Sequence, residues 1–121
     1  MKRDMDLIRK ILLTVQDMDA VDTTEVVVEN YDRDMVGYHI HLLLDAELLD
    51  GGKSATLRNP YGYLVRRLTW DGHEFLDLAR NDTIWNKAKA FVAERGLDIS
   101  IKVLVPVLTQ LVTERLGLTN G

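Results

Sequence analysis

The sequence predicts an α+β protein that is mainly helical, with one basic β-hairpin between amphipathic helices. Apolar residues recur at helical spacing in several segments. One stretch of β-branched and aromatic residues surrounds a turn signal instead, which is typical of a hairpin. The length of 121 residues, with 46% hydrophobic and 28% charged residues, is that of a soluble globular domain. It excludes a disordered chain, a collagen-like chain and a coiled-coil rod.

The first helix is expected over residues 4–17. Its buried face follows from apolar residues at positions i, i+3, i+4 and i+7, which are Ile8, Ile11, Leu12 and Val15. Asp4 and Asp6 in the first turn favour a helix start, because negative charge is stabilised at the positive end of the helix dipole. The aspartates at positions 17, 19 and 22 predict a loop after it.

A short strand and a second helix are expected next. The run Thr24–Glu29 is rich in β-branched residues, which favour a strand. Asp32 is a suitable N-cap for a helix over 33–46. The buried face of that helix consists of Val36, Ile40, Leu43 and, less centrally, Leu44. Gly37 inside the segment weakens the helix, because glycine loses more backbone entropy on folding than other residues.

The hairpin is predicted from two turn signals and the residues between and after them. Asp50-Gly51-Gly52-Lys53 is the first turn signal. Ala55 to Arg58 and Tyr63 to Thr69 can then pair as strands, with Asn59-Pro60-Tyr61-Gly62 as the turn between them.

Helices are also expected over residues 72–80, 83–95 and 99–116. Asp82 or Thr83 would cap the second of these, and Gly96 would end it. The last helix carries an apolar stripe with the spacing of a packing seam, formed by Ile101, Leu104, Leu108 and Leu111. Pro106 lacks a backbone N–H group and predicts a kink or a late helix start. The aromatic residues of this half are expected in the core, namely Trp70, Phe75, Trp85 and Phe91.

Charge is segregated along the chain, although the net charge is only −4. Residues 18–50, here called the acidic third, carry nine acidic residues against the single base Arg33. Residues 51–69 carry no acid and four bases, which are Lys53, Arg58, Arg66 and Arg67. This asymmetry indicates where a polyanion can dock and where it is repelled.

Several chemistries have no support in the residue pattern. Cysteine is absent, which excludes disulfides and thiolate chemistry and fits a cytoplasmic location. No apolar run is long enough to span a membrane, and the first residues lack the apolar region of a signal peptide. His39 and His41 lie about 200° apart on a helix, so they cannot chelate one metal ion. Catalytic and phosphate-binding motifs are missing, so we expect neither an enzyme nor a cofactor or metal.

The predicted order of elements, helix, strand, helix, hairpin and helix, resembles a winged helix. The stretch Val36–Leu49 resembles the end of a recognition helix that leads into the wing, and Arg67–Leu76 resembles the second wing strand with its following helix. The resemblance implies a winged-helix-like domain over residues 1–81. Residues 82–121 would form a C-terminal helical extension that packs on this domain or forms a dimer interface.

A more specific resemblance covers most of the chain to about residue 95. Met1–Arg9, Leu68–Asp77 and Asp82–Lys87 are similar to an uncharacterised family of small bacterial and prophage proteins, known only as a domain of unknown function. It implies a phage or prophage setting and no particular activity.

The sequence departs from a DNA-binding winged helix in two ways. The segment 18–30 stands where a separate helix normally precedes the recognition helix, and Glu47 stands where a glycine usually ends that helix. The face that would enter the major groove consists of Gly37, Tyr38, His41, Leu42 and Asp45. It lacks the Arg, Lys, Asn and Gln side chains that read bases.

Two classes of function remain open. The first is a regulatory winged-helix protein of phage origin that binds double-stranded DNA weakly through the wing, with contacts from Lys53, Arg58, Tyr61, Tyr63, Arg66 and Arg67. The second is a protein-interaction module, accessory or antirepressor-like, that has lost DNA binding. Its surface would comprise Tyr38, Leu42, Ile101, Leu104, Leu108 and Leu111, of which the last four would also form a homodimer seam. We expect Leu42 to be more than half buried, either by the C-terminal region of the chain or by a partner. An alternative role for the hairpin cations is to neutralise the acidic third of the same molecule.

Overall fold

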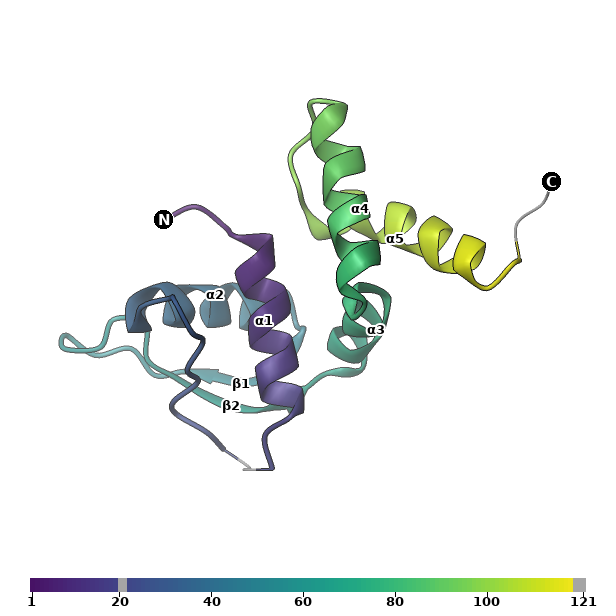
Figure 1. The fold of residues 1–121 in the computed structure, drawn as a ribbon. Coiled ribbons are helices and arrows are strands. Elements are labelled where there is room, and N and C mark those ends of the chain that lie inside the picture. The colour runs from purple at the N-terminus through teal and green to yellow at the C-terminus, as the bar shows by residue number, and fades with distance from the viewer. Residues whose placement is uncertain (20–21, 119–121) are drawn as a thin grey trace. The chain divides into compact units, whose positions relative to one another are not determined.

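The computed structural model describes residues 1–19 and 22–118, which form five helices and one two-stranded antiparallel sheet (Figure 1). In chain order the elements are α1 (Met5–Gln16), α2 (Arg33–Asp45), β1 (Leu49–Lys53), β2 (Tyr63–Leu68), α3 (Trp70–Ala79), α4 (Asp82–Glu94) and α5 (Ile101–Arg115). The predicted α+β, mainly helical class is confirmed. None of these helices is both long and apolar enough to cross a membrane.

The chain divides into two compact units, Met1–Glu74 and the residues from Phe75 onward. These are called the N-terminal unit and the C-terminal unit. The division falls inside α3. The boundary after residue 81 that the sequence suggested stays a prediction.

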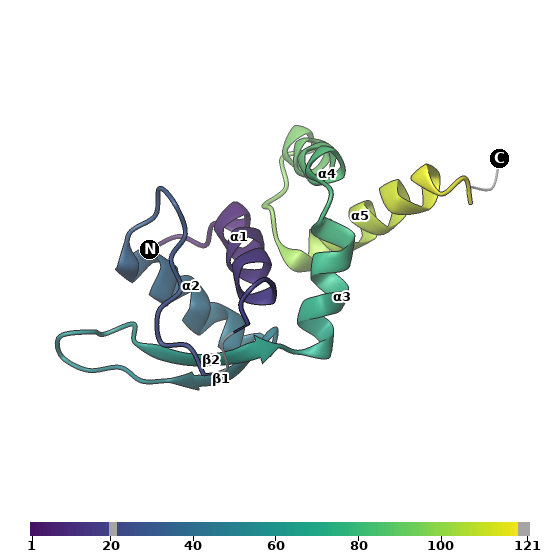
Figure 2. The same ribbon diagram turned by 60° about the horizontal axis from the view of Figure 1, so that its bottom comes forward.

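In the N-terminal unit, α1 and α2 pack against each other and against the hairpin. Figure 2 shows the two strands side by side along the helices, with the loop between the strands reaching beyond them. Every residue that the helical spacing placed centrally inside α1 and α2 is buried, namely Ile8, Ile11, Leu12, Val15, Val36, Ile40 and Leu43. Asp4 caps α1 by accepting from the N–H groups of Asp6 and Leu7, and Asp32 caps α2 through the N–H of Met35.

The end of α2 shows how the chain manages without the usual glycine. Glu47 adopts a positive φ of 59°, a left-handed conformation that favours glycine. The N–H of Leu48 then donates to the carbonyl of Leu43 at 2.9 Å, which closes the helix end. Glu47 therefore performs the glycine's role at a local conformational cost.

The first hairpin strand is Leu49–Lys53, so the prediction of a strand at 55–58 is wrong. Leu49 pairs with Leu68 and Lys53 with Tyr63, with a register shift between Asp50 and Gly51. Gly51 lies so close to the Leu64 carbonyl that a side chain would collide with it, which is why glycine occurs inside this strand. Residues 55–58 form an exposed loop, because the inward-facing apolar residues lie nearer the base of the hairpin.

The predicted strand at Thr24–Glu29 is also not formed. Within residues 22–29, Thr23 alone bridges to the sheet, exchanging N–H and carbonyl hydrogen bonds of 2.8 Å with Val65. Residues 25–28 that follow are neither helix nor strand. Their β-branched composition favours extended backbone, but a strand is completed only by a partner ladder.

In the C-terminal unit, α4 packs against α5. The cap of α4 is Asn81, whose side chain accepts from the N–H of Ile84 at 3.0 Å, and not Asp82 or Thr83. Gly96 has a positive φ of 70° and ends the α4 segment as predicted. The helix α5 starts at Ile101 and runs through Pro106, so the expected late start does not occur.

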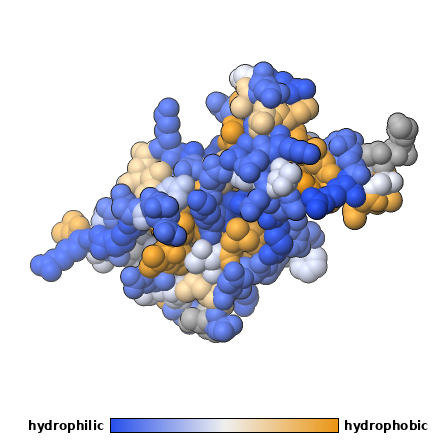
Figure 3. All heavy atoms as spheres, in the orientation of Figure 1, coloured by the Kyte–Doolittle hydropathy of each residue, from blue (hydrophilic) through white to orange (hydrophobic). Residues whose placement is uncertain are grey.

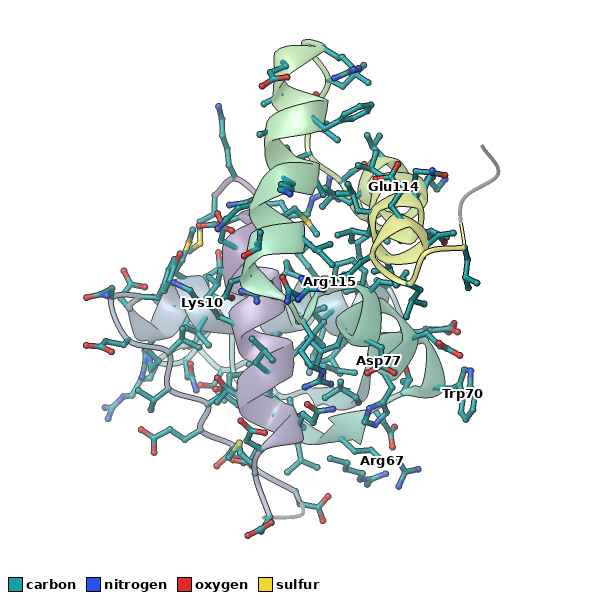
Figure 4. The ribbon with its side chains drawn as sticks, turned by 45° about the vertical axis from the view of Figure 1, so that its right-hand side comes forward. Lys10, Arg67, Trp70, Asp77, Glu114 and Arg115 are labelled. Atoms are coloured by element: carbon teal, nitrogen blue, oxygen red, sulfur yellow. The ribbon has the colours of Figure 1, made fainter. Side chains whose placement is uncertain are left out.

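The aromatic residues expected in the core divide into two groups. Phe75 and Trp85 are buried and meet edge to face, with ring centroids 6.3 Å apart. Phe91 is partly exposed beneath the Arg95 guanidinium, and Trp70 is 79% exposed, so their placement in the core is wrong. In Figure 4 Trp70 projects away from α3. Trp70 lies two residues before the buried Gly72 in α3. Because residues two apart on a helix point to nearly opposite sides, the Trp70 side chain faces away from the core.

Candidate nucleic-acid interface

The turn of the hairpin is anchored on α2 through Tyr61. A side chain at Gly37 would meet the carbonyl oxygen of Tyr61 at 2.6 Å and its Cβ at 2.7 Å, so only glycine permits this approach. The Tyr61 ring meets the rings of Tyr38 and His41 edge to face, each with centroids 5.8 Å apart. His41 Nε2 also lies 2.8 Å from the carbonyl oxygen of Gly62 and donates to it. The glycine in α2 is therefore a docking position for the hairpin.

This anchoring occupies the helix face that a winged helix presents to the major groove. Of the expected groove-facing residues, Gly37 is buried, and Tyr38, His41 and Leu42 are partly buried. Asp45 is exposed, and its carboxylate pairs with Lys53 Nζ at 2.7 Å. The hairpin thus covers on α2 the surface that base reading requires to be open.

Three of the four hairpin cations pair with carboxylates of the acidic third. Besides the Lys53–Asp45 pair, Arg66 lies 3.1 Å from Asp22 and Arg67 lies 3.5 Å from Asp50. All these side chains are substantially exposed, as the open position of Arg67 in Figure 4 illustrates. Exposed pairs of this kind contribute only about 0–1 kcal/mol each. They lower the local positive potential rather than lock the side chains in place.

Arg58 differs from the other hairpin cations. Its guanidinium has no carboxylate within ion-pair distance in the described part of the chain, while its carbonyl accepts from Arg33 at 3.2 Å. A tight turn between Thr56 and Asn59 presents it, closed by the Thr56 N–H bond to the Asn59 carbonyl at 2.9 Å. Leu57 beside it is fully exposed. Arg58 is therefore the hairpin cation that has no carboxylate partner among the described residues.

Tyr63, which the sequence placed at the tip of the hairpin, lies in the core instead. It is buried on β2, and its hydroxyl oxygen accepts from the N–H of Val26 at 2.7 Å. Burial raises the pKa of the Tyr63 phenol above its ordinary value of 10.0, against a smaller opposing effect of the Val26 hydrogen bond. Tyr63 shares strand parity with the buried Val65, and this signal in the sequence could have placed it inside.

His39, which the sequence analysis considered only as a metal ligand, is a structural residue. It is fully buried, and its Nε2 accepts from the N–H of Asp4 at 2.8 Å. Its Nδ1 lies 2.8 Å from the carbonyl of Met35 and so carries the proton that it donates. The ring thereby joins the start of α1 to α2. Residues 1–19 and 22–118 contain no group of three or more side chains placed to hold a metal ion.

The residues expected to form a second interaction surface are divided between the two units. Tyr38 and Leu42 belong to the N-terminal unit and are partly buried. In the C-terminal unit, Leu104 and Leu108 are fully buried, whereas Ile101 and Leu111 are partly exposed. The centre of the predicted dimer seam is therefore already buried in the single chain. Self-association stays a prediction.

Comparison with known proteins places the chain in a family. Residues 2–98 match the family described as "Hypothetical protein (DUF2513)". The chain belongs to this family. An uncharacterized protein of Haemophilus influenzae is 35% identical over 119 residues, which cover 97% of this chain and all of that protein. No solved structure matches the chain. The resemblance to an uncharacterised family that the sequence motifs indicated is confirmed.

Proposed function

We propose that this chain is a protein-interaction module whose N-terminal unit does not read DNA bases. The observation that carries the proposal is the packing of Tyr61 over Gly37, Tyr38 and His41 on α2. A helix that reads bases must present an open face to the major groove, with side chains such as Arg or Asn on it. The corresponding face of α2 is covered by the chain's own hairpin.

The charge arrangement supports the same function. Affinity for DNA comes mainly from cations that replace counterions on phosphates. Three hairpin cations are paired with Asp22, Asp45 and Asp50, and the whole chain carries a net charge of −4. The sequence resemblance implies a phage or prophage setting, in which an accessory or antirepressor-like role would rest on binding to a protein.

Weak binding to double-stranded DNA through the hairpin is the second candidate. The exposed pair Leu57 and Arg58 favours it, because Arg side chains enter narrow minor grooves and apolar side chains wedge between base steps. One phosphate contact gives a log–log salt slope of about −0.9, whereas all four hairpin cations together would give about −3.6. The slope therefore distinguishes the two functions.

The test is a titration of a generic fluorescent duplex, followed by anisotropy between about 50 mM and 200 mM salt. We expect either no binding or a slope near that of a single contact. Arg58→Ala should remove any residual binding, whereas Lys102→Ala, which removes an exposed cation on α5, should leave it unchanged. A steep slope that the triple Arg58, Arg66 and Arg67 to Ala variant abolishes would overturn the protein-interaction proposal and establish DNA binding.

A further inference from the structure

The residues Glu25–Glu29, called the 25–29 edge, have the sequence of a strand without a strand partner. In the described residues, the N–H groups of Val27 and Glu29, which point to the same side of an extended chain, donate no hydrogen bond within the chain. The carbonyls of Val27 and Glu29 likewise accept none. Free backbone groups on a β-branched run are the usual template for pairing with another chain.

Burial along this edge alternates as it does in a strand with one face on the core. Val26 and Val28 are buried at 5% and 7% exposure, whereas Val27 between them is 72% exposed. Glu25 and Glu29 are exposed and share the parity of Val27. In a sheet formed with an added strand, the outward-facing side chains of this segment would therefore be Glu25, Val27 and Glu29.

The structure holds this edge in place and leaves space beside it. The Tyr63 hydroxyl fixes the Val26 N–H at 2.7 Å, and the bridge at Thr23 ties the chain just before the edge to β2. A cavity of about 450 Å³ adjoins the edge, and Tyr31, Arg33 and Asn59 line it together with residues 24–28. It offers room for a side chain of an added strand.

On the face drawn in Figure 3, hydrophobic residues of the described chain form small groups among hydrophilic ones. Recognition by backbone pairing does not need a large apolar patch, because the main-chain hydrogen bonds supply the affinity.

A second copy of this chain is a poor occupant of the edge. Antiparallel pairing centred on Val27 would place Glu25 opposite Glu29 at both ends of the ladder. Parallel pairing in register would place each glutamate beside itself. Like charges directly opposite each other destabilise a sheet, whereas opposite charges stabilise it. Charge complementarity thus calls for basic residues at both ends of the partner strand.

We propose that the 25–29 edge takes an extended segment of a partner protein as an added β-strand, with Lys or Arg opposite Glu25 and Glu29. A β-branched residue of the partner lies opposite Val27. This inference rests on the proposed protein-interaction function and names its surface and the chemistry of its partner.

The test uses a capped peptide with the sequence Lys-Val-Thr-Val-Lys between flanking threonines. A matched peptide with Glu in place of both Lys residues is the control. We expect the basic peptide to bind saturably and to slow hydrogen exchange at the Val27 and Glu29 amides, which donate no hydrogen bond in the free chain. The acidic peptide should bind at least about tenfold more weakly.

Variants separate strand pairing from simple charge attraction. Val27→Pro removes the backbone donor and should abolish binding, whereas Val27→Thr retains the donor and the β-branched shape and should bind normally. Glu25→Lys with Glu29→Lys should reverse the peptide preference. Thermal unfolding of each variant establishes that it is folded.

Two results would overturn the inference. One is the absence of saturable binding by the basic peptide. The other is binding that Val27→Pro leaves intact, because this would show attraction without pairing. Either result would leave the proposed protein-interaction function in place, with its binding surface elsewhere on the chain, because the DNA titration tests that function separately.

Discussion

The N-terminal unit joins segments that are far apart in sequence, whereas the C-terminal unit is assembled from helices that follow one another. His39 is hydrogen-bonded to a residue 35 positions away, and Tyr63 to one 37 positions away. In the C-terminal unit, α4 packs on the next helix α5, and side-chain hydrogen bonds such as Thr113 to Thr109 stay within one turn. The first unit thus adds contacts between distant segments to its apolar core, whereas the second is held mainly by packing between neighbouring helices. Single substitutions should therefore act differently in the two.

The largest effect is expected from removing volume in the C-terminal unit. Leu108 on α5 is fully buried, so Leu108→Ala should lower the free energy of unfolding by about 2–5 kcal/mol. Leu111 on the same helix is partly exposed, and Leu111→Ala should cost clearly less. Urea denaturation followed through the buried Trp85 measures both. Equal losses would contradict the assignment of Leu108 to the core.

A smaller effect is expected where the hairpin docks on α2. Alanine is a better helix former than glycine, so propensity alone predicts that Gly37→Ala stabilises the protein. A Cβ atom at position 37 would lie 2.6 Å from the Tyr61 carbonyl oxygen, which reverses this, and we expect a loss of about 1–3 kcal/mol from overpacking.

Gly52→Ala is the matched control for this substitution. Gly52 lies in β1, and a Cβ atom added to it would meet no other atom within 4 Å. Alanine there should therefore change the free energy of unfolding by less than about 0.5 kcal/mol. Chemical denaturation of both variants measures these two changes in the free energy of unfolding. A stabilised Gly37→Ala protein would show that the hairpin tip is not docked on α2.

The smallest effect concerns the single contact that fixes the 25–29 edge. Tyr63→Phe removes the acceptor for the Val26 N–H and should lower the free energy of unfolding by about 1 kcal/mol at neutral pH. Denaturation with paired measurement of Val26 amide exchange checks this. Unchanged exchange at Val26 would contradict the role of the hydroxyl.

The same residue predicts a dependence on alkaline pH. Because burial raises the pKa of Tyr63 in the folded protein above 10.0, the neutral phenol is favoured by folding. Its contribution is complete below pH 10 and is lost as the pH rises through the raised pKa. Stability of the parent should therefore fall more steeply above this pH than that of Tyr63→Phe. Parallel pH curves would contradict the burial effect.

The sequence alone was sufficient for the helices and their inner faces. Their bounds agree to within about two residues, and residues such as Ile11 and Ile40 are buried as their spacing predicted. Asp32 and Gly96 mark a helix start and a helix end as expected. These features depend on hydrogen bonds and contacts between residues three or four apart, so a short window of sequence contains the information that sets them.

The candidate site could be predicted only as a set of residues and not as an arrangement. The basic hairpin residues were identified, but the pairing of Arg66 with Asp22 joins positions 44 apart, which no local pattern reveals. The burial of Tyr63 and the outward position of Trp70 likewise depend on which face each element turns to its neighbours.

Local sequence therefore determined where helices form and which residues of α1 and α2 turn inward. Tertiary structure decided that the Thr24–Glu29 run stays without a ladder, that Gly37 receives Tyr61, and that the hairpin cations meet the acidic third. The physical reason is the range of the interactions. A helix satisfies its backbone within itself, whereas a strand, a docking glycine and an ion pair each need a partner that folding brings from a distant part of the chain.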